Sequence, residues 1–276
     1  MAVEIDEFEP NDEELDELRQ LILQEYGYDF SGYARSSQKR RIAEFMRRRK
    51  IRDIREIFVN LSHREFFENL IAALVISTTE FFRDPGFFIA LKREVIPMLR
   101  TYPHFKIWHA GCSTGEEPFS LAILLKEEGL LDRAVIYATD INKVKVARAK
   151  QGLVSSLAVK YGSKNYFDAG GQKSLASYFT SKYDQSSIDP DLLENITFGE
   201  HNLATDASFG EMNLILCRNV LIYFTRELQE TVLRLFLDSL VRRGYLGLGS
   251  KESLALLSLR EQFEVIDANE KIFRRR

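Results

Sequence analysis

The chain has 276 residues, 45% of them hydrophobic and 29% charged, with a formal net charge of −3. This composition is typical of a soluble globular protein, and the negative charge excludes a polycation that binds nucleic acid through its overall charge. No apolar run is long enough to span a bilayer and the N-terminus does not resemble an export signal, so we expect a cytoplasmic protein without membrane insertion. The two cysteines are predicted to be free buried thiols, and the four histidines lack ligand spacing, so no metal is expected.

The first 75 residues are predicted to form a small all-helical domain. After an acidic leader, apolar residues recur at helical spacing, first in a helix at 12–26 and then in a helix at 36–50. No strand pattern with turn residues interrupts them. A stretch of β-branched and polar residues at 77–85 ends at a proline and is predicted to connect this domain to a second one at 76–276.

The rest of the chain alternates between predicted strands and helices. The strands are expected at 105–110, 134–139, 196–200, 212–217, 245–249, 263–267 and 271–274, and the helices at 116–127, 143–150 and 225–241. This alternation predicts an α/β fold: a mostly parallel sheet with helices on both faces and one closing antiparallel strand. The segment 161–195 is rich in Ser, Tyr, Gly and Asp and is predicted to form a small inserted lobe.

A glycine turn follows the first predicted strand of this sheet. Gly111 and Gly115 lie in it, and the next helix begins with Glu116 and Glu117. Glycine lets the backbone approach a ligand where a Cβ would clash, and open α/β sheets bind nucleotide-like cofactors at such turns. The glutamates would repel a dinucleotide pyrophosphate at the helix N-terminus. They suit S-adenosylmethionine, which carries hydroxyls and positive charge.

Two further strand ends carry polar residues. Asp140 follows the second predicted strand, where a carboxylate can accept hydrogen bonds from ribose hydroxyls or can cap the next helix. Asn219 and Tyr223 follow the apolar strand at 212–217 and are expected to face the same cleft. Their alternatives are a helix cap for Asn219 and a core position for Tyr223.

Cationic residues stand out in two places. Arg83 lies beside two phenylalanines in the connector, where it can hold a carboxylate bidentately or form an interdomain salt bridge. The helix at 36–50 has an apolar stripe and a strongly basic opposite face, which is either solvated or docks an acidic partner. The basic residues of this helix are Lys39, Arg40, Arg41, Arg47, Arg48, Arg49 and Lys50. No aromatic platform accompanies them, which argues against nucleic acid.

Together these segments resemble the CheR family of chemotaxis receptor methyltransferases. Four blocks carry the resemblance: Thr-Thr-Glu-Phe-Phe-Arg at 78–83, Ser-Thr-Gly-Glu-Glu-Pro at 113–118, Ala-Thr-Asp at 138–140 and Cys-Arg-Asn-Val-Leu-Ile-Tyr-Phe at 217–224. The resemblance implies a Rossmann-like methyltransferase domain after an all-α domain. It also implies a protein-glutamate O-methyltransferase that uses S-adenosylmethionine, releases S-adenosylhomocysteine and forms methyl esters on the cytoplasmic helices of chemoreceptors.

The resemblance also implies which residues form the site. The cofactor contacts would be Ser77, Thr79, Arg83, Gly111, Glu117, Asp140, Asn202, Leu203, Asn219 and Val220. Ser77 is a departure, because an asparagine is common at that position. Arg83 and Tyr223 would line the methyl-transfer site. The match favours Glu117 as the cofactor contact and leaves Glu116 as a charge at the helix N-terminus.

The expected partners are receptor methylation helices that dock on the basic helix 36–50. Family members that tether to a receptor's C-terminal peptide have a glycine-rich turn in the inserted lobe, whereas the matching piece here, 180–187, has no glycine. Tethering is therefore not expected, and we expect a monomer. Two alternatives stay open: a methyltransferase acting on RNA or a small molecule, and a non-catalytic sensor of the cofactor.

Overall fold

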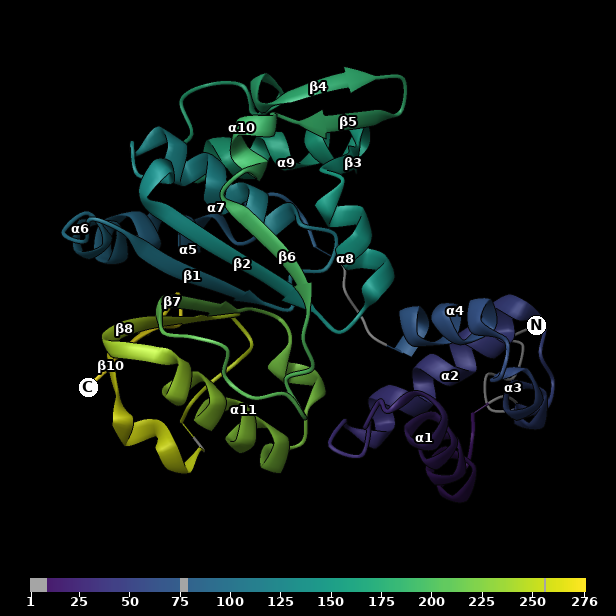
Figure 1. The fold of residues 1–276 in the computed structure, drawn as a ribbon. Helices are drawn as coiled ribbons and strands as arrows, with labels where there is room; N and C mark the ends of the chain where they lie inside the picture. The colour runs from purple at the N-terminus through teal and green to yellow at the C-terminus, as the bar shows by residue number, and fades with distance from the viewer. Residues whose placement is uncertain (1–8, 75–78, 256) are drawn as a thin grey trace. The chain divides into compact units, whose positions relative to one another are not determined.

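The computed structural model describes residues 9–74, 79–255 and 257–276 (Figure 1). The chain divides into two compact units: unit one is Met1–Ile76 with Tyr223–Gln229, and unit two is Ser77–Ile222 with Glu230–Arg276. Among the described residues, none of the helices has both the length and the apolar character needed to cross a bilayer.

Between residues 9 and 74, unit one contains the helices α1 (Asp12–Tyr26), α2 (Arg35–Arg49), α3 (Ile54–Asn60) and α4 (Arg64–Leu74). The helices predicted at 12–26 and 36–50 are confirmed, the second shifted by one residue. A capping box of Asn11 and Glu14 starts α1, because each side chain accepts a hydrogen bond from the other residue's backbone amide. The apolar stripes of α1 and α2 are buried, as an amphipathic pattern requires.

The short segment Tyr223–Gln229 returns to unit one from the far part of the chain. The Ala34 amide donates to the Tyr223 carbonyl at 2.9 Å, and the Thr225 amide donates to the Gly32 carbonyl at 2.8 Å. Tyr33 packs edge-on against Phe224, with ring centroids 4.9 Å apart. These contacts explain why residues so distant in sequence belong to one compact unit.

Unit two is organised around a seven-stranded sheet with the order β6-β2-β1-β7-β8-β10-β9. The strands are β1 (Phe105–Ala110), β2 (Ala134–Asp140), β6 (Ile196–Glu200), β7 (Met212–Cys217), β8 (Leu240–Leu248), β9 (Phe263–Asp267) and β10 (Ile272–Arg275). The first five strands in this order are parallel, and β10 is antiparallel to both of its neighbours. The predicted mostly parallel sheet is confirmed. The strand order reverses at β1, and ligands of such sheets bind beyond the strand ends at this point.

Helices cover both faces of the sheet (Figure 1). They are α5 (Pro85–Ala90), α6 (Ile96–Leu99), α7 (Glu116–Glu127), α8 (Lys143–Lys150) and α11 (Arg226–Ser239), with a π-helical turn, η2 (Leu91–Val95), joining α5 to α6. Successive residues of a strand point to opposite faces. Ile107 of β1 accordingly belongs to the cluster that contains Phe119 of α7, whereas Trp108 contacts Phe236 of α11 with ring centroids 5.5 Å apart.

The boundary between α11 and β8 differs from the prediction. The helix expected at 225–241 ends at Ser239, and Leu240 already begins the strand that was expected at 245–249. Leu240 pairs with Met212 of β7, and the register shifts before Tyr245. A continuous run of apolar residues fits either element, so only the pairing with β7 fixes where the helix stops.

A second, three-stranded antiparallel sheet accompanies the main one, with the order β3-β5-β4. Its strands are β3 (Leu153–Ser155), β4 (Phe179–Lys182) and β5 (Gln185–Ile188), together with the helices α9 (Ser156–Asp168) and α10 (Pro190–Leu193). The sheet therefore begins ahead of Tyr161, the first residue of the predicted lobe. Tyr166 and Tyr178 both donate to the Glu127 carboxylate, which anchors this part to α7.

Candidate cofactor site

The glycine turn after β1 has the left-handed backbone that glycine permits. Gly111 has φ 90° and Gly115 has φ 97°. A Cβ on Gly111 would lie 2.4 Å from Val220 Cγ2, and one on Gly115 would lie 2.8 Å from the Phe119 ring. Neighbouring protein side chains thus explain both glycines. A contact between Gly111 and the cofactor stays a prediction.

Asp140, the last residue of β2, joins two turns. Its Oδ2 accepts the Ser113 amide at 2.8 Å and its Oδ1 accepts the Asn142 amide at 2.9 Å. Burial raises the pKa of the Asp140 carboxyl, and these amides partly oppose the shift. The helix-cap alternative goes instead to Asn142, whose side chain accepts the Lys145 amide. Each carboxylate oxygen keeps a lone pair for a hydroxyl donor.

Glu117 forms a buried ion pair that the sequence did not indicate. Its Oε2 lies 2.6 Å from Arg218 Nη1, and its Oε1 lies 3.4 Å from His109 Nδ1. Burial pushes the pKa of the Glu117 carboxyl upward, but Arg218 and His109 outweigh it, so the pKa lies below its ordinary value. Arg218 also contacts Asp84 Oδ2 at 2.8 Å and the Arg83 carbonyl at 3.1 Å, which ties the connector to this end of the sheet.

The neighbouring Glu116 has a different environment. Its carboxylate is buried and accepts the Thr114 hydroxyl at 2.6 Å. Burial raises the pKa of Glu116 above 4.5. Glu116 lies in the first turn of α7, the helix N-terminus where it was predicted, and its carboxylate is buried there beside the Thr114 hydroxyl.

The Glu116→Gln variant should gain stability relative to the wild type as pH rises. A buried carboxyl with a raised pKa binds more protons in the folded state, so its contribution is fully present below the unfolded pKa and is lost as pH rises above about 4.5. Glutamine keeps the Thr114 hydrogen bond and does not ionise. Denaturant unfolding of both proteins between pH 4 and 8 measures the difference, and a constant gap between them would contradict the assignment.

The segment after β7 is held by one residue that the sequence reading missed, Glu252. Its Oε1 accepts the Val220 and Leu221 amides at 2.8 and 2.7 Å, and its Oε2 accepts the Asn219 amide at 3.1 Å and the Gly249 amide at 2.5 Å. Asn219 adopts φ 60°, a conformation that asparagine tolerates. The available signal was a glutamate three residues after Gly249, the glycine that follows β8.

The predicted adenine contacts lie in the segment after β6. Asn202 and Leu203 are both buried, and the His201 amide donates to the Asp140 carbonyl at 3.2 Å. The Asn202 side-chain oxygen accepts the Ala204 amide at 3.0 Å, so the asparagine shapes its own turn. This turn lies directly beside Asp140.

The remaining predicted site residues are Ser77, Thr79, Arg83 and Tyr223. Thr79 and Arg83 are half-buried, and Ser77 lies outside the described residues. Tyr223 belongs to unit one, where the Arg41 guanidinium lies 5.9 Å from its ring centroid. Within unit two, direct contacts or shared partners link most of the predicted cofactor contacts. These linked residues are Arg83, Gly111, Glu117, Asp140, Asn202, Asn219 and Val220.

Both cysteines are buried in unit two. Cys112 and Cys217 are free thiols, as predicted, and burial raises the pKa of each well above its ordinary value. Within residues 9–74, 79–255 and 257–276, no three His, Cys, Asp or Glu side chains are placed to hold a metal ion. The strand ends offer the carboxylates of Glu117 and Asp140, backbone amides and the Arg218 guanidinium, which suit a polar organic cofactor.

Comparison with known proteins decides the family. Residues 77–272 match the SAM binding domain of CheR methyltransferase, and residues 13–75 match the all-alpha domain of CheR methyltransferase. The chain belongs to the CheR methyltransferase family. It is a methyltransferase whose cofactor is S-adenosylmethionine, as the strand-end residues predicted.

Relatives match along most of this CheR family chain. It is 45% identical over 259 residues to the putative methyltransferase Cher3 of Pseudomonas putida, covering 94% of this chain and 95% of that protein. It is 32% identical over 237 residues to a chemotaxis protein methyltransferase of Listeria innocua, covering 85% of this chain and 87% of that protein. Chemotaxis protein methyltransferase 1 of Pseudomonas aeruginosa is 32% identical over 217 residues, 73% of this chain and 74% of that protein.

Proposed function

We propose that this enzyme methylates glutamate side chains on the cytoplasmic helices of chemoreceptors and forms glutamate methyl esters. The observation that carries the proposal is the match of both domains to one family, with relatives that are named chemotaxis protein methyltransferases. A protein carboxylate is an acceptor that this site suits, because an ionised carboxylate needs no catalytic base to activate it.

The residues at the strand ends fit S-adenosylmethionine, which supplies an electrophilic methyl group when bound. Asp140 has lone pairs left for ribose hydroxyls after binding two amides. Glu117 and Arg218 offer both signs of charge for an amino acid moiety. Asn202 and Leu203 would lie beside the adenine, and Asn219 with Val220 would close the pocket. Ser77 and Thr79 would contribute from the connector.

The acceptor needs positioning rather than activation. A glutamate with a pKa of about 4.3 is ionised at neutral pH. In-line alignment and exclusion of water then provide the rate enhancement, up to roughly 7–11 kcal/mol in ideal cases. We assign Arg83 to orienting the substrate carboxylate and Tyr223 to steering it toward the methyl group. A tight ion pair with Arg83 would blunt the nucleophile, so its role is positional.

The Asp140→Ala variant should bind S-adenosylhomocysteine roughly 10- to 150-fold more weakly, the equivalent of about 1.5–3 kcal/mol for hydrogen bonds to a charged group. The same change frees the Ser113 and Asn142 amides, so a matched variant is needed. Asp140→Asn keeps an acceptor for one of these amides and should lose less affinity. Titration calorimetry measures both, and unchanged affinity in Asp140→Ala would remove this residue from the site.

The basic face of α2 is narrower than the sequence suggested. Lys39 pairs with Asp12 and Arg48 pairs with Glu44. Arg41 donates to the Ala73 carbonyl at 3.3 Å, and the Arg49 guanidinium lies 5.3 Å from the Phe45 ring centroid. Of the seven basic residues predicted for this helix, the three that remain form no ion pair with any described residue: Arg40, Arg47 and Lys50.

These three residues form the docking face in our proposal. Positions 40 and 47 are seven residues apart, so their side chains share one face of α2. Lys50 follows directly as the left-handed residue that ends the helix, so it adds a third charge next to Arg47. All three are exposed. A row of unpaired cations is complementary to receptor helices that are rich in glutamate, and such complementarity mainly accelerates association.

The Arg40→Gln/Arg47→Gln variant should therefore lower receptor methylation at least fivefold at low salt, with unchanged cofactor affinity. The control is Arg52→Gln/Arg55→Gln, which removes the same charge from exposed positions near α3. Methylation by the wild type should fall steeply as salt rises, and the variant should show a shallower dependence. Equal rates for variant and control would indicate that the basic face is merely solvated.

Transfer of a labelled methyl group to receptor cytoplasmic fragments tests the proposed function itself. Methyl esters are hydrolysed by mild base, whereas N-methyl and C-methyl products are stable. Release of the label by base from a glutamate peptide supports the proposal. Base-stable label would indicate another acceptor class, and tight cofactor binding without transfer to any fragment would indicate a sensor.

A further inference from the structure

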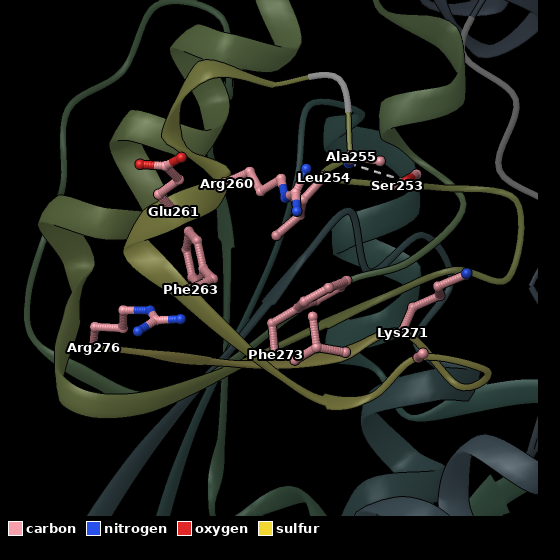
Figure 2. Close-up of a pocket in the computed structure, with 11 residues that line it drawn as sticks. Ser253, Leu254, Ala255, Arg260, Glu261, Phe263, Lys271, Phe273 and Arg276 are labelled. Atoms are coloured by element: carbon pink, nitrogen blue, oxygen red, sulfur yellow. Dashed lines mark hydrogen bonds between the residues drawn. The ribbon is translucent and has the colours of Figure 1, made fainter.

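Unit two contains a pocket of about 700 Å³ between the loop that follows β8 and the hairpin β9–β10 (Figure 2). This volume is typical of sites for small organic molecules. Three segments line it: residues 253–255 of the loop, the 3₁₀ helix η6 (Ser258–Gln262) and the hairpin. None of its residues belongs to the predicted cofactor contacts.

The floor of the pocket is apolar. Leu254, Phe263 and Phe273 are buried, whereas Val265 is 58% exposed. Val265 and Phe273 are partners in the β9–β10 register, so their side chains lie side by side on one face of the hairpin. The floor is thus a small apolar surface with one open side, suited to a flat or compact apolar group.

The rim of the pocket is cationic. Arg260, Lys271 and Arg276 contribute three positive side chains against one negative side chain, Glu261. None of the three forms an ion pair within the described ranges, whereas the adjacent Arg274 is paired with Glu264 at 2.6 Å. Figure 2 shows the Arg276 guanidinium on the side of Phe263 and the Arg260 guanidinium beside Leu254, with the Glu261 carboxylate turned away from the phenylalanine rings.

We propose that this pocket binds an organic phosphate of nucleotide size, with an aromatic body on the floor and phosphate groups on Arg260 and Arg276. Arginine recognises phosphate oxygens bidentately, and a charge of −2 or more would balance the rim. The wall at Ser253 directly follows Glu252, which holds the amides after β7. An occupant would therefore contact the loop that supports the cofactor site.

Titration calorimetry with GDP tests the proposal, in saturating S-adenosylhomocysteine so that the cofactor site is filled. GDP should bind the wild type, while guanosine and pyrophosphate, which carry only one part each, should bind at least tenfold more weakly. Naphthyl phosphate serves as a probe without a nucleoside. Failure of both GDP and naphthyl phosphate to bind at about 1 mM would overturn the proposal, as would pyrophosphate binding as tightly as GDP.

The Arg260→Gln/Arg276→Gln variant should bind GDP at least tenfold more weakly. Both arginines are exposed, so the fold should tolerate the change. Arg234→Gln, an exposed position of α11 outside the pocket, is the control and should stay within twofold of the wild type. Equal affinity in the double variant and the control would contradict the assigned phosphate contacts. Because the test measures binding with the cofactor site filled, its outcome is independent of the methyl acceptor.

Discussion

The Arg218→Met variant should lower the free energy of unfolding by about 3–5 kcal/mol, the cost of leaving a buried charge without its partner. Arg218 is buried and contacts the carboxylates of Glu117 and Asp84, and its guanidinium carbon lies 4.1 Å from the Phe87 ring centroid. Methionine preserves much of the volume but none of the charge. Chemical denaturation of the purified protein measures the loss.

Two comparisons make this result specific. Arg100→Met removes an arginine that is paired with Glu128 on the surface, and it should cost no more than about 1 kcal/mol. The double variant Arg218→Met/Glu117→Gln leaves no buried carboxylate at position 117 and should recover part of the stability. If the free energy of unfolding of Arg218→Met lies within about 1 kcal/mol of the wild type, the Glu117 carboxylate is well solvated without Arg218, and the assignment is wrong.

The Glu252→Ala variant should weaken S-adenosylhomocysteine binding more than tenfold and destabilise the protein by about 3–5 kcal/mol, because buried amides lose their acceptor. One carboxylate holds the amides of Asn219, Val220, Leu221 and Gly249. The loss should therefore be larger than for any single hydrogen bond. Calorimetry gives the affinity and thermal unfolding gives the stability.

The Glu252→Gln variant removes the negative charge of the side chain and keeps almost the same shape. It keeps a carbonyl acceptor but places an amide donor where a backbone N–H now points, so its effect should be intermediate. Glu264→Ala, which removes a surface partner of Arg274, should leave the affinity unchanged and stability within about 1 kcal/mol. Wild-type cofactor affinity in Glu252→Ala would refute the role of Asn219 and Val220 in closing the pocket.

Elements with strong local signals were predicted closely. The helix α7 and the strand β7 have the predicted bounds, because a glycine turn and an abrupt change from apolar to polar residues mark their ends. The α11–β8 boundary was not found, since Leu240 and Val241 suit either element. The short strand β3 was also missed, because three residues carry too little periodicity to identify.

The sequence predicted which strand ends form the candidate site, but it did not predict which residues pair with one another there. Asp140 and Asn219 were indicated because they lie at or just beyond the end of a buried strand, and the family resemblance singled out Glu117 in the first turn of the next helix. The sequence did not indicate that Glu117 pairs with Arg218, or that Glu252 holds the Asn219 amide. Arg218 was visible as the charge that follows β7, but its two carboxylate partners lie 101 and 134 residues away in sequence.

The sequence by itself determined the fold class and the cofactor class. Both depend on local features: hydrophobic periodicity sets the alternation of strands and helices, and a parallel sheet places every strand end at one edge. Only the tertiary structure decided which partners each site residue contacts within the described residues. Gly111 is required by Val220, and the basic face of α2 is reduced to Arg40, Arg47 and Lys50. Pairing, burial and pKa depend on atoms brought together from distant segments, and no local pattern encodes which of them meet.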